Sequence, residues 1–105
     1  MSDKAWKRAE RMVAKRLGGR RVGNSGRNTE DVFHDWLSVE VKERRELPLW
    51  LQAAMAQAWH NAPSGHLPLV VLHELGQRHD GDLVVLRLAD FEAWFGDVDG
   101  RDAGA

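Results

Sequence analysis

The stretch DVFHDWLSVEVKERR, residues 31–45, decides the fold class of this chain. Residues 31–33 and 37–44 alternate between apolar and polar side chains, and this period of two is typical of β-strands. The intervening residues 34–36 indicate a hairpin turn. The sequence therefore predicts two strands that pair with each other as a hairpin.

Glu40 and Lys42 are the chemically informative residues of this hairpin. They lie two residues apart on one strand, so both side chains project from the same face while Val41 faces the core. If the hairpin adopts the register that pairs Asp31 with Glu40, two carboxylates come within about 5 Å at Cβ. Such a pair needs a cation, and hard oxygen ligands favour Mg²⁺ or Mn²⁺. Lys42 beside that ion would orient a bound water or offset charge on a phosphate, which predicts phosphodiester hydrolysis.

Helices are predicted on both sides of the hairpin. Residues 2–17 have the spacing of a helix that ends at Gly18, and we expect its apolar stripe in the core: Trp6, Ala9, Val13 and Leu17. Glu10 lies at the edge of this stripe, where a carboxylate needs a compensating partner. Residues 48–62 predict a second helix that begins at Pro48, with an apolar stripe of its own: Leu47, Leu51, Ala54, Met55, Ala58 and Ala62.

The second half of the chain predicts a further hairpin and a third helix. Residues 67–74 are expected to form a buried strand that pairs with a strand at residues 83–88. Residues 89–95 predict a short helix capped near Asp90. A short extended piece is expected at residues 20–22, and the order of elements predicts a mixed α/β domain.

Composition limits the class of protein. With 105 residues, 43% of them hydrophobic and 30% charged, the chain has the size and composition of one globular domain. The lack of cysteine excludes disulfides and a cysteine nucleophile, and it suits a reducing, intracellular compartment such as the cytoplasm. The longest apolar run, residues 69–72, is far shorter than the ~18 residues of a membrane span, so we expect no membrane association.

The net charge of −1 hides a strong asymmetry between the two parts of the chain. Residues 1–45 contain twelve Lys and Arg against seven Asp and Glu, whereas the remaining 60 residues contain three against nine. A basic front half favours an anionic partner such as nucleic acid. Residues 96–105 contain few apolar side chains and predict a flexible acidic tail.

Taken together, these features resemble the PD-(D/E)XK nuclease superfamily, and within it the Holliday-junction resolvase-like proteins of archaea and phages. The resemblance covers about residues 3–75: a helix carboxylate, a basic Gly/Ser loop, Asp31-Val32, Val39-Glu40-Val41-Lys42, and an amphipathic helix. It implies an α/β fold with a single restriction-endonuclease-like domain, residues 1–95, whose mixed central sheet is flanked by helices. The implied function is a metal-dependent, structure-selective endonuclease that hydrolyses four-way or other branched DNA in recombination and acts as a homodimer.

The resemblance also implies roles for particular residues. Glu10, Asp31, Glu40 and Lys42 would be catalytic, and the three acids among them would bind Mg²⁺ or Mn²⁺. Gln57 would support the site. Contacts with branched or double-stranded DNA are expected for side chains of the basic half and of its Gly/Ser loop: Arg8, Arg11, Ser25, Arg27, Arg44 and Arg45.

Other residues of the chain are weaker candidates for this chemistry. Glu30 stands where the superfamily signature has proline, and Asp35 rivals Asp31 as the motif acid, although a hairpin turn suits Asp35 better. We expect the five histidines to be surface or hydrogen-bonded residues rather than metal ligands, and Trp50 and Trp59 to be core or dimer-contact residues rather than base-stacking platforms. The glycines match no dinucleotide or P-loop motif, so no nucleotide cofactor is expected.

Two alternatives to a junction-cleaving enzyme stay open. One is a nicking or restriction-like nuclease that acts as an accessory to another protein. The other is a non-catalytic DNA-binding or adaptor protein, in which Asp31, Glu40 and Lys42 form only a surface cluster of charges.

Overall fold

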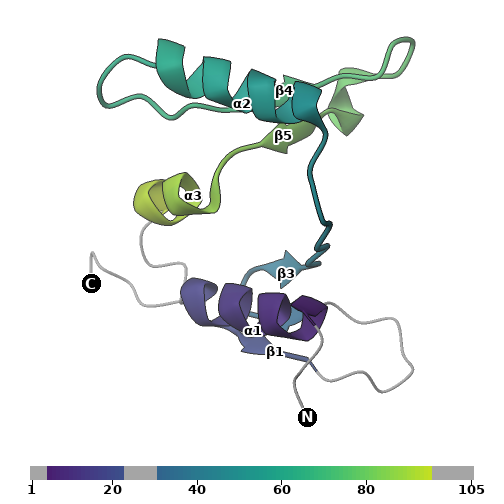
Figure 1. The fold of residues 1–105 in the computed structure, drawn as a ribbon, viewed down its shortest axis with the longest axis vertical. Coiled ribbons are helices and arrows are strands. Elements are labelled where there is room, and N and C mark those ends of the chain that lie inside the picture. The colour runs from purple at the N-terminus through teal and green to yellow at the C-terminus, as the bar shows by residue number, and fades with distance from the viewer. Residues whose placement is uncertain (1–4, 23–30, 96–105) are drawn as a thin grey trace. The chain divides into compact units, whose positions relative to one another are not determined.

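The computed structural model describes residues 5–22 and 31–95, which form three α-helices, one 3₁₀ helix and two small antiparallel sheets (Figure 1). The chain divides into a first compact unit that ends at Arg45 and a second unit, Glu46–Phe95. The mixed α/β composition that the sequence predicts is confirmed. The strands expected in one mixed central sheet lie instead in two separate antiparallel sheets, because each strand pairs with a neighbour close in sequence.

The first unit begins with helix α1, Ala5–Leu17, which ends where the sequence predicts. Gly18 has a φ of 73°, a backbone conformation that favours glycine. The Gly19 N–H donates to the Ala14 carbonyl at 2.9 Å, and the Gly18 N–H donates to the Lys15 carbonyl at 3.3 Å. These two bonds satisfy two of the carbonyls in the last turn of the helix in the Schellman arrangement.

Helix α1 contacts a three-stranded sheet with the order β1-β2-β3. Its strands are short: β1 is Arg20–Arg21, β2 is Val32–Phe33 and β3 is Ser38–Val39. Val32 pairs with Val39 and Phe33 with Ser38, so the predicted hairpin is confirmed, and its register is the one that sets Asp31 opposite Glu40. The alternation of faces is also confirmed, because Leu37, Val39 and Val41 are partly buried while the residues between them are exposed.

The core of the first unit consists of Ala14, Leu17 and Val32, the last fully buried. Trp6 was expected in this core, but 41% of it is exposed. The two-residue strands β1 and β2 are too short to cover the whole apolar stripe of α1, so the helix buries the line through Glu10, Ala14 and Leu17 instead.

The second unit contains helix α2, the hairpin β4–β5 and helix α3. Helix α2 spans Leu49–Asn61 with Pro48 as its N-cap, one residue later than predicted. Strands β4, Val70–Leu72, and β5, Leu83–Val85, form the predicted hairpin, with the 3₁₀ helix η1, His79–Gly81, in the connection. Helix α3 spans Leu88–Phe95 and begins before the predicted cap, because the Phe91 N–H already donates to the Arg87 carbonyl.

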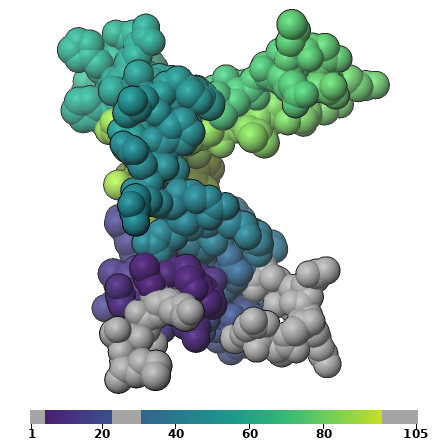
Figure 2. Space-filling view, turned by 45° about the vertical axis from the view of Figure 1, so that its right-hand side comes forward, coloured from purple at the N-terminus to yellow at the C-terminus, as the bar shows by residue number. Residues whose placement is uncertain are grey.

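No residue of the second unit is buried. The strand at residues 67–74 was expected to be buried, but Val71 is exposed, because α2 packs against β4 and leaves part of the strand uncovered. Trp50 and Trp59 are likewise exposed on α2, so neither is a core residue of this chain. In the space-filling view the side chains of α2, in teal, lie at the surface, and the green segment that connects β4 to β5 projects from the unit (Figure 2). Within the described ranges, no helix has the length and apolar character needed to cross a bilayer.

Candidate functional site

The hairpin β2–β3 places two of the predicted acids at the same end of the sheet. The pairing of Val32 with Val39 sets Asp31 at the position opposite Glu40. At this position the hydrogen bonds between the two chain segments involve both backbone and side chain. The Asp31 N–H donates to the Val39 carbonyl at 2.8 Å, and the Val41 N–H donates to the side-chain oxygen Asp31 Oδ2 at 2.6 Å. These bonds hold the Asp31 carboxylate beside the strand that contains Glu40, and Oδ1 is not engaged in them.

Lys42 and Glu40 lie on one face, as their spacing predicts. Lys42 Nζ is 3.7 Å from Glu40 Oε2, and the side chains are 69% and 57% exposed. Both groups are therefore accessible to a ligand that approaches from solvent. An exposed carboxylate beside an ammonium group offers an oxygen ligand for a hard divalent ion together with a cation for an anionic substrate.

Glu10 is held elsewhere. Its carboxylate is buried against the first sheet, and Arg21 Nε donates to Glu10 Oε1 at 2.6 Å. Glu10 thus has the compensating partner that its position demands, but this partner is the Arg21 guanidinium of β1. The structure does not bring Glu10, Asp31 and Glu40 together as three ligands, because their oxygen atoms do not form a group within 4.8 Å of one another.

Asp35 lies in the turn between β2 and β3 and is exposed. Its position in the register is next to Trp36 and away from Glu40, which favours Asp31 as the motif acid. The neighbouring His34 is buried, and its Nδ1 accepts the Trp36 N–H at 3.3 Å. This bond stabilises the turn that sets the register.

The residues predicted to contact DNA, and Gln57, which was predicted to support the site, lie in different parts of the chain. Arg8, Arg11, Arg44 and Arg45 have exposed side chains in the first unit. Gln57 is exposed on α2 in the second unit. Ser25 and Arg27, with the predicted tail at residues 96–105, lie outside the described residues.

The second unit contains a cluster of possible metal ligands that the sequence analysis does not predict. His73, His79 and Asp82 form the one group of three or more His, Asp or Glu side chains, among residues 5–22 and 31–95, whose ligand atoms lie within 4.8 Å of one another. The signal in the sequence is two histidines separated by five residues, with an aspartate three positions after the second. His60 and His66 have the same spacing but no such aspartate, so spacing alone does not single out the first pair.

Comparisons with the families of known proteins, with characterised proteins and with solved structures found no match to this chain. The function is therefore argued from the chemistry of the site.

Proposed function

We propose that this protein is a metal-dependent DNA endonuclease with a restriction-endonuclease-like fold, and that it acts on four-way or other branched DNA. The observation that supports this most directly is the register of β2 and β3, which sets Asp31 opposite Glu40 with Lys42 beside it. This is the order of an acid, a second acid and a lysine that the PD-(D/E)XK resemblance requires.

The donor set fits Mg²⁺ or Mn²⁺. Asp31 and Glu40 supply carboxylate oxygens, and the exposure of Glu40 leaves room for water and a phosphate oxygen around an ion. A bound divalent ion would supply Lewis acidity and an activated water for attack at phosphorus. Lys42 places a positive charge beside the phosphate, where negative charge develops as the bond to the leaving oxygen breaks. Glu10, tied to Arg21, supports the sheet behind these residues.

The proposed DNA substrate rests on the distribution of charge along the chain, and the proposed dimer rests on the exposed apolar side chains of the second unit. The basic first part of the chain favours contacts with phosphates, which do not depend on base sequence. We propose a homodimer because two symmetric cuts require two active sites. Its interface would use apolar side chains that the second unit exposes: Leu49, Trp50, Trp59, Val71 and Val84.

Cleavage of matched DNA substrates tests the enzyme proposal. Four-way junctions, forks, flaps and linear duplexes of one sequence are incubated with the protein and Mg²⁺ or Mn²⁺. We expect the junction to be cut, and Glu40→Gln and Lys42→Met to reduce the rate by about a hundredfold or more. Glu43→Gln, a neighbouring exposed carboxylate, is the matched control and should cleave at the normal rate.

Two outcomes would contradict the proposal. Normal cleavage by both Glu40→Gln and Lys42→Met would remove these residues from the chemistry. Binding of junction DNA without cleavage under any divalent ion would favour the non-catalytic adaptor, for which the exposed Glu40–Lys42 ion pair is only a surface contact.

A further inference from the structure

The cluster of His73, His79 and Asp82 lies where the hairpin β4–β5 opens into its connection. Val70, Val71 and Leu72 pair with Val85, Val84 and Leu83, and the same register continued by one step places His73 opposite Asp82. His79 begins η1, and the Asp82 N–H donates to the His79 carbonyl at 2.9 Å. The end of β4, the start of β5 and the helix η1 therefore each contribute one side chain to a single cluster.

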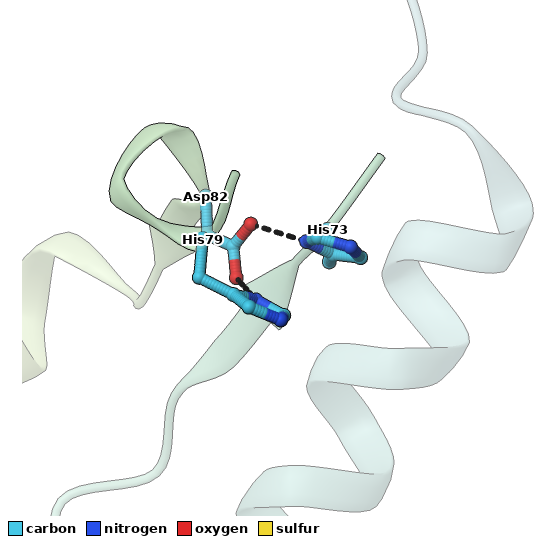
Figure 3. Close-up of side chains that lie close together, drawn as sticks. All are labelled: His73, His79 and Asp82. Carbon is cyan, nitrogen blue, oxygen red and sulfur yellow. Dashed lines mark hydrogen bonds and ion pairs between the residues drawn. The ribbon is translucent and has the colours of Figure 1, made fainter. Parts of the chain in front are cut away.

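The side chains converge on one carboxylate (Figure 3). His73 Nδ1 lies 2.6 Å from Asp82 Oδ1, and His79 Nδ1 lies 2.9 Å from Asp82 Oδ2. The two imidazole rings stack with their centroids 4.1 Å apart and an interplanar angle of 24°. Both nitrogen atoms thus face the same carboxylate from one side, which brings all three ligand atoms within 4.8 Å of one another.

Two imidazole nitrogens and a carboxylate oxygen are the donor set of a first-row transition ion, and above all of Zn²⁺. Tetrahedral bonds of ordinary length separate neighbouring ligand atoms by roughly 3.3 Å, so small side-chain rotations would admit the ion. The exposure of His79, 81% at its side chain, leaves the fourth position open to water or to another ligand. Mg²⁺ is a poor match, because it prefers oxygen ligands.

The second unit also lacks a buried core, so a bound metal ion would add stability there. None of the residues in Glu46–Phe95 is buried, and its sheet has only two three-residue strands. Small units with little buried apolar surface commonly need an additional link, and a structural zinc ion contributes folding free energy directly. An ion at this cluster would tie the end of β4, the start of β5 and η1 together.

We propose that His73, His79 and Asp82 form a zinc-binding site that stabilises the β4–β5 hairpin. The site is distinct from the carboxylate pair of the first unit and independent of nuclease activity. The competing explanation is that Asp82 only accepts hydrogen bonds from two histidines. In that case the cluster stabilises the turn without any metal, and metal addition changes nothing.

Titration of the metal-free full-length chain with Co²⁺ and Zn²⁺ separates the two explanations. We expect one Co²⁺ per chain with the visible absorption bands of a four-coordinate ion, displaced by Zn²⁺ and retained in excess Mg²⁺. His73→Ala with His79→Ala should weaken Zn²⁺ binding by about tenfold or more, and Zn²⁺ should raise the Tm of the wild type but not of this variant. His60→Ala, an exposed histidine of α2, is the matched control and should behave as the wild type.

The result that overturns the proposal is equal Zn²⁺ affinity in the wild type and in the double variant, or no metal-induced rise in the wild-type Tm. If the double variant does not fold, Asp82→Asn gives the same comparison, because asparagine keeps the size of the side chain and one acceptor oxygen. Wild-type Zn²⁺ affinity in Asp82→Asn together with normal folding would equally exclude this site. DNA cleavage is not measured, so failure of the zinc proposal leaves the nuclease proposal untouched.

Discussion

Two ion pairs of the first unit differ mainly in burial. Glu10 and Arg21 have side chains only 10% and 22% exposed, and their charged atoms are 2.6 Å apart. Glu40 and Lys42 are largely exposed and 3.7 Å apart. A buried pair leaves an uncompensated charge when one partner is removed, whereas water replaces the lost partner of an exposed pair. The first pair therefore stabilises the fold, whereas the second contributes little to stability.

Glu10→Gln is expected to lower the free energy of unfolding by about 3 kcal/mol, because it leaves the Arg21 guanidinium without its counter-charge. Glu40→Gln should lower it by less than about 1 kcal/mol. Urea unfolding at neutral pH, followed by far-UV circular dichroism, measures both. Equal stability of the two variants would mean that the Glu10–Arg21 pair contributes nothing beyond a surface contact.

The junction between α1 and β1 shows how one glycine joins two elements. A Cβ atom on Gly19 would collide with the Phe33 carbonyl oxygen and would lie 2.9 Å from Val32 Cγ1. Both obstacles belong to β2, and one of them is backbone that cannot rotate away. The absence of a side chain at Gly19 thus allows the helix end and the strand to approach each other.

We expect Gly19→Ala to destabilise the protein by about 2 kcal/mol or more, because β1 must move away from β2 to relieve the contact. Gly81→Ala is the control, since a Cβ there meets no atom within 4 Å and stability should change little. Thermal unfolding of the purified variants provides the measurement. A Tm for Gly19→Ala equal to that of Gly81→Ala would show that the close approach does not hold in solution.

The uneven distribution of charge along the chain predicts which part would contact DNA in the proposed complex. Residues 1–45 have a net charge of +5 and the remaining residues −6, so we expect any contacts with phosphates to concentrate in the first part of the chain. Each phosphate contact releases counterions, which makes the affinity fall with salt.

Replacing Arg44 and Arg45 together by Gln should reduce the slope of log K against log salt by about 2 units if both side chains contact phosphates. Arg78→Gln, a 91% exposed arginine of the second unit, should leave the slope unchanged. Fluorescence anisotropy with labelled junction DNA at several salt concentrations, without divalent metal, measures the slope. An unchanged slope in the double variant would exclude these two arginines from the DNA contact.

Exposed apolar side chains of the second unit predict self-association. Trp50 on α2 presents a large apolar surface to solvent, which a second copy of the chain would cover in the proposed homodimer. Trp50→Gln should shift the sedimentation coefficient from dimer toward monomer at micromolar concentration, whereas Met12→Gln on α1 should not. A wild-type protein that sediments as a monomer would contradict the dimer.

Local structure in this protein follows from short-range patterns in its sequence. Period-two alternation predicts the β2–β3 hairpin and Gly18 marks the end of α1, whereas the register that sets Asp31 opposite Glu40 comes from the structure. These features depend on neighbours within a few residues, where propensity and the geometry of a short turn leave few options.

Contacts between side chains distant in sequence follow from the packing of whole elements and could not be predicted from local patterns. Glu10 pairs with Arg21, eleven positions away, because Gly18 and Gly19 turn the chain so that β1 lies along α1. His73 and Asp82 meet through the pairing of β4 with β5, and η1 adds His79. The burial of Trp6 also depended on the extent of the covering sheet. Contacts of this kind depend on strand pairing and on the size of the covering surface, which the period of a local pattern does not specify.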